Sequence, residues 1–310
     1  MSLIKKIFQY LSILIIVILI HYLIIVTILR FNFDFTYNNK TTRHSQDIFA
    51  PHKVFIESHG GGNNTLESFS KVIDDNIESL ETDVWLTKDN VLVLIHADSQ
   101  GKIDNYLNHK GNIKELKWKK LSTLRTKKDK LKMPKLENLL KLAKNKIFIN
   151  LEIKDPRVNL VFPYIIKLIE KYDFFDQITI SSFYHKYFNK IDKYNKKNHK
   201  KLTFGFIYKR NMTNYDFTKR GHTLNIYWNE TTKEICDKAH KNGMAVIAWF
   251  GIQDDDSLKN YKKLINKGVD VICCNYPLLA KNYRDSLFSN SIFGYLNIFV
   301  ENIKKVFFKG

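Results

Sequence analysis

The chain has 310 residues, of which 44% are hydrophobic and 14% aromatic, and it carries a formal net charge of +19 at pH 7. This length accommodates one large domain with an appendage, and three cysteines, an odd number, provide no disulfide framework. The basic balance fits either an anionic membrane partner or lysines spread over solvated surfaces. Neither zinc-finger spacing nor an arginine-rich recognition pattern is present, which argues against nucleic acid as a partner.

Residues 11–28 form an almost wholly apolar run in which His21 is the only side chain that titrates near neutral pH. A run of this length predicts a membrane-spanning helix. A cleaved signal peptide is the alternative, but it needs a shorter apolar core and small residues at a cleavage site, and residues 28–31 are bulky. We therefore expect a single-pass membrane protein, with an anchor and its flanks over 1–31 and a polar linker over 32–52.

From residue 53 onward, predicted strands alternate with predicted helices, which is typical of parallel strands joined by crossover helices. The expected strands are 53–58, 79–84, 91–96, 146–152, 177–181, 202–207, 223–227, 244–249 and 269–274. The expected helices are 65–77, 136–145, 158–172, 184–197, 231–242 and 255–267.

The predicted fold class is α/β, a TIM-type (β/α)8 barrel preceded by an N-terminal transmembrane helix. Such a barrel needs about 250 residues, which residues 53–283 nearly provide. The pattern contains one strand more than the barrel needs, and we expect either 202–207 or 223–227 to be accessory.

Two further segments depart from the alternation of strands and helices. Residues 97–135 are rich in lysine, which indicates either a solvated basic surface or a patch that faces anionic lipid head groups. Residues 284–310 carry apolar side chains at helical spacing with lysines near the end. We expect an amphipathic helix there, which either lies in a membrane interface or packs against the barrel.

The stretch 56–98 places ionisable side chains at the ends of predicted strands, namely His59, the pair Glu81 and Asp83, and His96. Residues two apart on a strand share a face, so Glu81 and Asp83 point the same way. Two carboxylates on one face repel each other unless a cation lies between them, and hard divalent ions prefer such oxygen ligands. Two histidines at neighbouring strand ends could flank that ion and transfer protons.

Short motifs follow one another through this stretch: His59-Gly60-Gly61, Asn64-Thr65, Glu81-Thr82-Asp83-Val84, Thr87-Lys88-Asp89-Asn90 and Ile95-His96. Their order and spacing resemble the glycerophosphodiester phosphodiesterase family. Further motifs extend the resemblance to about residue 280: Met133-Pro134-Lys135-Leu136-Glu137, Asn150-Leu151-Glu152-Ile153-Lys154, Ile180-Ser181-Ser182-Phe183, Ala248-Trp249-Phe250, Gly268-Val269-Asp270-Val271-Ile272 and Asn275-Tyr276-Pro277.

The resemblance implies a barrel whose active site binds a divalent metal ion, Mg²⁺ or Ca²⁺. Glu81, Asp83 and Glu152 are implied as the metal ligands. His59 and His96 are implied as the catalytic general base and general acid, and the resemblance does not decide which is which.

Two residues are candidates for substrate binding, and two positions depart from the family pattern. The resemblance places Lys154 near the phosphate, and Trp249 is a candidate either for an apolar wall beside the substrate or for the barrel core. Gly60 stands where the family has an arginine that helps to hold the phosphate, and Asn63 stands where it has a glutamate. We expect weaker phosphate binding, or compensation by backbone amides of the run 60–62. If phosphate binding is weaker, Gly60→Arg should raise activity.

The predicted function is that of a membrane-anchored, metal-dependent hydrolase. Its expected partners are the membrane and a phospholipid-derived phosphodiester, a glycerophosphodiester or a lysophospholipid, from which it releases an alcohol such as choline or ethanolamine. The alternative is a catalytically weak or inactive barrel that binds phospholipid head groups, which Gly60 and Asn63 favour. A phospholipase D of the spider-venom type shares the barrel, but the motifs at 87–89 and 134–137 favour the phosphodiesterase.

Overall fold

The computed structural model describes residues 54–289. The predicted anchor over 1–31 and the predicted linker over 32–52 lie outside the described residues, as does most of the predicted helix over 284–310. Within residues 54–289, no helix is both long enough and apolar enough to cross a bilayer.

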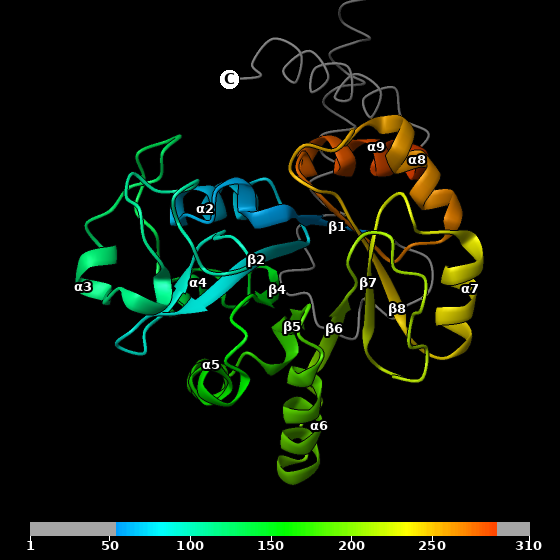
Figure 1. Ribbon diagram of the computed structural model, residues 1–310. Coiled ribbons are helices and arrows are strands. Elements are labelled where there is room, and N and C mark those ends of the chain that lie inside the picture. The colour runs from blue at the N-terminus through cyan, green and yellow to red at the C-terminus, as the bar shows by residue number, and fades with distance from the viewer. Residues whose placement is uncertain (1–53, 290–310) are drawn as a thin grey trace, which may run out of the picture. The chain divides into compact units, whose positions relative to one another are not determined.

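A closed barrel of parallel strands forms the centre of the described domain (Figure 1). Its strands follow the order β1, β2, β4, β5, β6, β7, β8, β9, and β9 pairs with β1 to close the ring. Their bounds are Phe55–Ser58, Ser79–Leu86, Phe148–Ile153, Ile178–Ser182, Thr203–Ile207, Thr223–Tyr227, Ala245–Trp249 and Val271–Cys274. The predicted TIM-type barrel is therefore confirmed.

The extra strand is β3 (Leu92–Leu94), which runs antiparallel to β2 and pairs with residues 84–86 of that strand. The accessory strand is thus the predicted 91–96, and our choice of 202–207 or 223–227 was wrong, because those segments are the barrel strands β6 and β7. An apolar pattern does not carry the direction of pairing, so the sequence could not separate a hairpin from a crossover. The hairpin brings the chain back to the barrel mouth, where the Ile95 amide donates to the Asp83 carbonyl at 3.1 Å.

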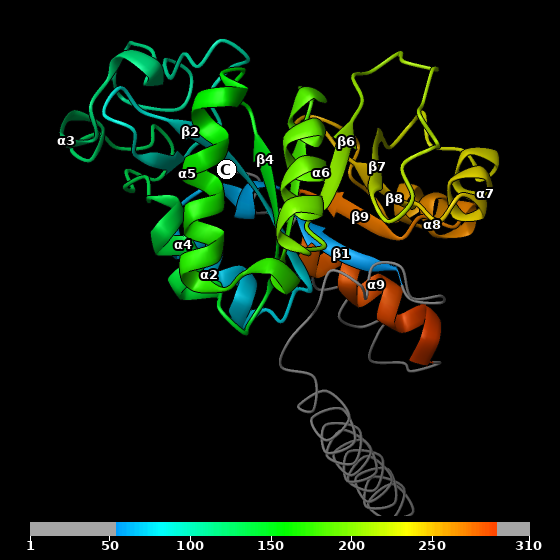
Figure 2. The same cartoon turned by 90° about the horizontal axis from the view of Figure 1, so that it is seen from below.

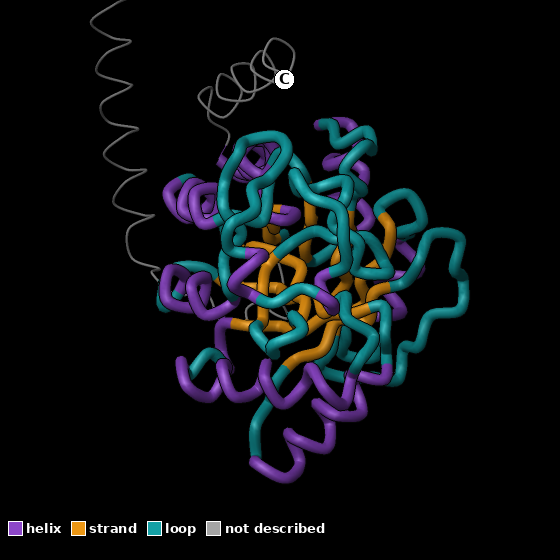
Figure 3. Tube along the Cα trace, turned by 60° about the vertical axis from the view of Figure 1, so that its left-hand side comes forward, coloured by secondary structure: helices purple, strands orange, loops and turns teal. Residues whose placement is uncertain are grey.

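Helices surround the strands on the outside (Figure 2 and Figure 3). Their bounds are α2 Leu66–Asp74, α3 Trp118–Leu121, α4 Leu136–Ala143, α5 Val158–Tyr172, α6 Lys186–Asn198, α7 Lys233–Lys241, α8 Leu258–Lys267 and α9 Pro277–Ser289. Each of the six predicted helices has a counterpart in this set. Local chemistry sets several ends: the Thr65 and Thr232 hydroxyls accept from the backbone N–H groups at the starts of α2 and α7.

Alternate residues of each strand point to opposite faces, which separates two environments. The outward residues, such as Leu80 and Ile149, are fully buried against the helices, and burying a side chain of this size stabilises the fold by roughly 1.5–3 kcal/mol. The inward residues at the base form a small apolar plug of Phe55, Phe148, Ala245, Ile247, Val271 and Cys273. Above this plug the inward residues become polar and charged, and this upper lumen holds the site.

Candidate active site

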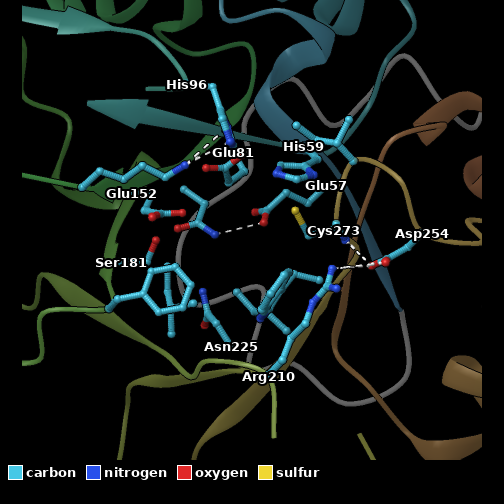
Figure 4. Close-up of a pocket in the computed structure, with 18 of the residues that line it drawn as sticks. Glu57, His59, Glu81, His96, Glu152, Ser181, Arg210, Asn225, Asp254 and Cys273 are labelled. Carbon is cyan, nitrogen blue, oxygen red and sulfur yellow. Dashed lines mark hydrogen bonds and ion pairs between the residues drawn. The ribbon is translucent and has the colours of Figure 1, made fainter. Parts of the chain in front are cut away.

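The carboxyl ends of the barrel strands open into a cavity of about 560 Å³. His59, Glu81, His96, Glu152, Lys154 and Trp249, six of the seven predicted site residues, line this cavity (Figure 4). The seventh, Asp83, is buried beside them and bonds to His96 and Lys154. The barrel therefore brings all the predicted site residues together at one mouth.

The acidic residues converge as a shared ion requires. Glu81 and Asp83 lie on β2, Asp83 is paired in register with Glu152 on β4, and one carboxylate oxygen from each residue lies within 4.8 Å of the others. Glu81 and Asp83 share a face because they are two residues apart on β2, and the register with β4 places Glu152 beside them.

Two of these carboxyl groups, Glu81 and Glu152, have raised pKa values, and each has one oxygen without a hydrogen-bond partner. Burial, followed by the charges of Asp83 and Glu152, raises the pKa of Glu81 well above its ordinary value. Burial chiefly raises the pKa of Glu152 to about 7. Glu81 Oε1 and Glu152 Oε1 are buried without a hydrogen-bond partner. Three converging carboxylates, two of them with an orphaned oxygen, form a donor set that fits a hard divalent cation.

Asp83 is held differently from its two acidic neighbours. Burial alone would raise its pKa, but the charges of Lys154 and His96 lower it below the ordinary value. One oxygen of Asp83 lies 2.9 Å from Lys154 Nζ, and the other lies 2.8 Å from His96 Nδ1. Burial would likewise lower the pKa of Lys154, but Asp83 and Glu152 raise it. Asp83 is therefore an ionised carboxylate that positions both a lysine and a histidine.

His59 follows β1 directly and has a neutral partner. Its Nδ1 lies 3.1 Å from Asn275 Oδ1, while the Asn275 amide nitrogen donates to the Gly251 carbonyl at 2.9 Å. This second bond fixes the Asn275 oxygen toward the ring, so Nδ1 of His59 donates and Nε2 keeps its lone pair. Burial, with a further contribution from His96, lowers the pKa of His59 to about 4. The ring is therefore neutral near pH 7.

His96 reaches the mouth by way of the β2–β3 hairpin. Because Asp83 is ionised and can only accept, Nδ1 of His96 donates to it. The ring packs against Tyr106 with centroids 5.0 Å apart, and the two histidine rings lie 6.2 Å apart. The two histidines thus have similar positions but opposite partners, a neutral amide for one and a carboxylate for the other.

The glycine run after His59 does not leave all of its amides free. The Gly60 N–H donates to Glu81 Oε2 at 2.8 Å, so this amide orients a carboxylate, and compensation for the missing arginine by the other amides of the run 60–62 stays a prediction. Gly60 and Gly61 have φ values of 59° and 54°, a left-handed conformation that glycine adopts at low cost. A Cβ on Gly60 would lie 3.2 Å from the Asn64 side chain. Asn63 forms a hydrogen bond with Asp129 in the lysine-rich segment.

Trp249 ends β8 and belongs both to the mouth and to the lumen packing. It meets Phe183 edge-on at 6.4 Å and Tyr227 at 5.1 Å between ring centroids. Arg210 lies over the Tyr227 ring at 4.2 Å, and its guanidinium pairs with Asp254 at 3.2 Å. The wall predicted at Trp249 is therefore part of an aromatic rim, which consists of Phe183, Tyr227 and Trp249, and the Arg210 guanidinium lies against this rim.

Several residues that shape the site were not among the predicted ones. Asn275 and Asn64 orient His59 and Asp83, and both lie inside motifs quoted above, although the sequence assigned them no role. Glu57 lines the cavity from β1, and its signal was a carboxylate two residues before His59 in an otherwise apolar strand. Arg210 lies in the β6–β7 loop, where no local pattern marks it.

Comparison with known proteins agrees with this geometry. The model of the glycerophosphoryl diester phosphodiesterase family matches residues 50–279. A (β/α)8 barrel with an acidic cluster and two histidines at its mouth is the architecture of a phosphoric diester hydrolase of this kind. The chain belongs to the glycerophosphoryl diester phosphodiesterase family.

Relatives cover most of the chain. A glycerophosphodiester phosphodiesterase of Bacillus altitudinis is 26% identical over 255 residues, which are 76% of this chain and 99% of the relative. A protein structure from Galdieria sulphuraria has a TM-score of 0.68 at 25% identity and covers 75% of this chain and 98% of its own. An Oleispira antarctica phosphodiesterase, solved with its product sn-glycerol-3-phosphate, has a TM-score of 0.63 at 18% identity, over 75% of this chain and 97% of its own.

Proposed function

We propose that this enzyme is a membrane-attached, divalent-ion-dependent phosphodiesterase that cleaves glycerophosphodiesters and releases an alcohol such as choline or ethanolamine. The observation that carries the proposal is the convergence of Glu81, Asp83 and Glu152 between His59 and His96. The product sn-glycerol-3-phosphate in the Oleispira structure supports the same substrate class for this chain. The complete set of histidines and acids favours catalysis over an inactive head-group-binding barrel.

The ion would be held by Glu81, Asp83 and Glu152, whose carboxylate oxygens are hard ligands, and one oxygen each of Glu81 and Glu152 is otherwise without a hydrogen-bond partner. When bound, a divalent ion neutralises phosphate charge and stabilises the transition state. Lys154 would add a fixed positive charge beside the phosphate, since Asp83 holds the Lys154 ammonium group at 2.9 Å.

The hydrogen-bond partners of the two histidines assign their roles in this proposal. His59 is neutral and keeps the lone pair on Nε2, so it accepts the proton of the attacking hydroxyl or water. Asp83 accepts from Nδ1 of His96 and so fixes the orientation of this ring, and in this proposal Nε2 donates a proton to the departing alcohol oxygen. The proton count balances because His59 takes one proton from the nucleophile and His96 gives one proton to the departing alcohol.

The aromatic rim is the proposed place for the alcohol. Trp249 and Phe183 offer ring faces and edges to an apolar or ammonium-bearing group. Arg210 lies 4.2 Å from the centroid of the Tyr227 ring and 5.9 Å from that of Trp249, so the alcohol would contact Phe183 and the part of Trp249 that Arg210 leaves uncovered.

Membrane attachment rests on the apolar run at 11–28, which lies outside the described residues. The full-length protein should sediment with membranes and resist extraction by salt and by alkali. Deleting residues 1–30 should release most of it. Alkali-resistant sedimentation of the deletion variant would show that another part of the chain holds the membrane.

The substrate proposal is tested by measuring choline and ethanolamine release by the purified protein. Glycerophospho- and lysophospho-substrates are compared with and without Mg²⁺ or Ca²⁺. We expect ion-dependent release from the glycerophosphodiesters. Failure to hydrolyse any phosphodiester under either ion would contradict the proposal.

A further inference from the structure

Few basic side chains face the catalytic cavity, although the chain as a whole is strongly basic. Among the described residues that line this cavity, Lys154 and Arg210 are the only lysine and the only arginine. Carboxyl groups are more numerous in and beside the cavity: Glu57, Glu81, Asp83, Glu152 and Asp254. A phosphodiester is an anion, so the state of these two cations decides which side chains attract it.

The two cations differ in how much of their hydrogen-bonding capacity is left for a ligand. Lys154 is 14% exposed, and its ammonium lies 2.9 Å from Asp83 Oδ1. The Arg210 side chain is 50% exposed, and only Nη2 reaches Asp254, at 3.2 Å and 3.4 Å from its two oxygens. Nε and Nη1 of Arg210 form no hydrogen bond with any residue of 54–289. Most N–H donors of this guanidinium are therefore available.

The position of the guanidinium is fixed by its surroundings. It lies 4.2 Å from the centroid of the Tyr227 ring and 5.9 Å from that of Trp249. A Cβ on Gly251 would overlap Arg210 Nη2 and lie 3.0 Å from Asp254 Oδ2, so the glycine leaves the space that the ion pair occupies. A side chain held in place before binding loses less conformational entropy when a ligand arrives.

The backbone beside Arg210 is fixed as well. Asn211 has a φ of 63°, and its amide donates to Glu230 Oε1 at 2.5 Å. The β6–β7 loop therefore presents Arg210 from a defined position. Figure 4 shows the Arg210 side chain rising from the rim into the space that His59, Glu57 and Glu152 also border.

We propose that Arg210 is a phosphate-binding residue, whose guanidinium donates to a phosphodiester oxygen that points away from the acidic cluster. This inference rests on the proposed function and deepens it. A planar guanidinium donates parallel N–H groups to phosphate oxygens, which a lysine ammonium does not do. Gly60, the residue after His59, brings no side chain to the mouth, and Arg210 supplies a charge from the β6–β7 loop instead.

Equilibrium binding tests this role without requiring turnover. The intact protein is titrated calorimetrically, in Mg²⁺, with inorganic phosphate and with sn-glycerol-3-phosphate. Arg210→Ala should weaken the binding of both ligands by roughly 10–100-fold, as expected for lost hydrogen bonds to a charged group. Arg210→Lys should recover part of the loss, because it keeps the charge without the planar fork.

The matched control is Arg220→Ala. Arg220 is an exposed arginine of the same loop, and it lies outside the lining of the catalytic cavity. Its removal lowers the net charge of the protein equally and should change neither affinity. A loss in both arginine variants would trace the effect to net charge and would overturn the proposal.

Chemical rescue separates a phosphate contact from a purely structural role of Arg210. Guanidinium ion, well below the concentrations that unfold the protein, should occupy the space left on Tyr227 in Arg210→Ala and restore part of the phosphate affinity. Urea, which is similar in shape and uncharged, should not. Guanidinium destabilises folded proteins, so a variant weakened only by a loosened loop would bind still less in its presence.

Two results would remove Arg210 from phosphate binding. One is an Arg210→Ala variant that binds both ligands as tightly as the wild type. The other is a weakened variant that neither lysine at this position nor guanidinium ion restores. Should Arg210→Ala fail to fold, as judged by circular dichroism, Arg210→Gln takes its place, since glutamine keeps a donor for Asp254.

Hydrolysis separates this inference from the proposed function. In an active protein, kcat/KM for glycerophosphocholine should fall in Arg210→Ala by a factor comparable to the loss of affinity, and an unchanged value would overturn the inference while the proposed function stands. Binding that behaves as expected in a protein without hydrolytic activity would sustain the phosphate contact and contradict the proposed function.

Discussion

His59 and His96 show how one residue type acquires two roles from its neighbours. The Asn275 amide, itself fixed by the Gly251 carbonyl, presents a neutral acceptor to one ring, and Asp83 presents a charge to the other. The difference lies in hydrogen-bond partners from β2 and from the segments that follow β8 and β9, not in the histidines themselves. It follows that removing either ring should abolish a distinct proton transfer.

His59→Ala and His96→Ala should each lower kcat by at least about 10²-fold, because general acid–base catalysis contributes roughly 10²–10⁴-fold per group. The circular dichroism spectrum should stay unchanged. The exposed His199, replaced by asparagine, is the matched control, since asparagine tolerates its φ of 52°. Full activity in His59→Ala would remove that residue from the mechanism.

Gly60 is the position where the structure reverses an expectation drawn from the sequence. An arginine there would take φ near 59°, which costs a residue with a side chain roughly 1–2 kcal/mol, and would crowd Asn64. We therefore expect Gly60→Arg to lower the free energy of unfolding by about that amount and not to raise activity. Gly60→Ala separates backbone strain from the guanidinium. Higher kcat/KM in Gly60→Arg than in wild type would restore the original expectation.

At the scale of elements, the helices and most strands were predictable, and the pairing was not. The six helices carry apolar stripes and mostly lie within a few residues of their predicted bounds, because that pattern is local. The assignment of β3 failed because three apolar residues after a turn look alike in a hairpin and in a crossover. Glu57, Asn150 and Ser181 could not be grouped either, since they meet only once the barrel closes.

Helix α9 binds the base of the barrel through one buried ion pair. Arg284 is fully buried, lies 2.8 Å from Glu78 Oε1, and donates to the Val54 carbonyl at 2.9 Å. The other oxygen of Glu78 accepts from the Ile56 amide at 3.1 Å. This pair therefore connects the last described helix to the start of β1 and to the residue before β2.

Arg284→Met should destabilise the protein by roughly 3–5 kcal/mol, because the buried Glu78 carboxylate loses the guanidinium that lies 2.8 Å from it. Guanidinium unfolding measures this change, and adding Glu78→Gln should recover part of the loss. Lys259→Met on the exposed face of α8 should stay within about 0.5 kcal/mol. A loss below about 1 kcal/mol for Arg284→Met would mean that the pair does not secure α9.

The stability of the whole molecule should depend on pH through buried neutral histidines. Burial lowers the pKa of His222 to about 4, with Asp192 partly opposing this, and Nδ1 of the ring accepts from the Phe204 amide at 3.0 Å. A lowered pKa means that the unfolded chain binds the proton first. The stabilisation from a neutral His222 is therefore complete above the ordinary pKa of 6.5 and is lost as pH falls from 6.5 toward 4.

Replacing His222 by asparagine, which keeps an acceptor for Phe204, should flatten this dependence. Binding of one proton changes the free energy of unfolding by about 1.4 kcal/mol per pH unit. Between pH 6 and about 4.5, the free energy of unfolding of the variant should therefore fall less steeply than that of the wild type, by up to this amount per pH unit. Denaturant unfolding at a series of pH values measures it. Identical slopes in the two proteins would show that His222 is not the group that titrates.

Glu81, Asp83 and Glu152 should hold a divalent ion that the reaction needs. The measurement is the rate of sn-glycerol-3-phosphate release from glycerophosphocholine after EDTA treatment, and again after adding Mg²⁺ or Ca²⁺. Wild-type protein and the exposed-site control Glu67→Gln should lose activity to EDTA and regain it with the ion, whereas Glu152→Gln should stay at least about 10²-fold slower in both. Full wild-type activity in EDTA, or full activity in Glu152→Gln, would contradict the account.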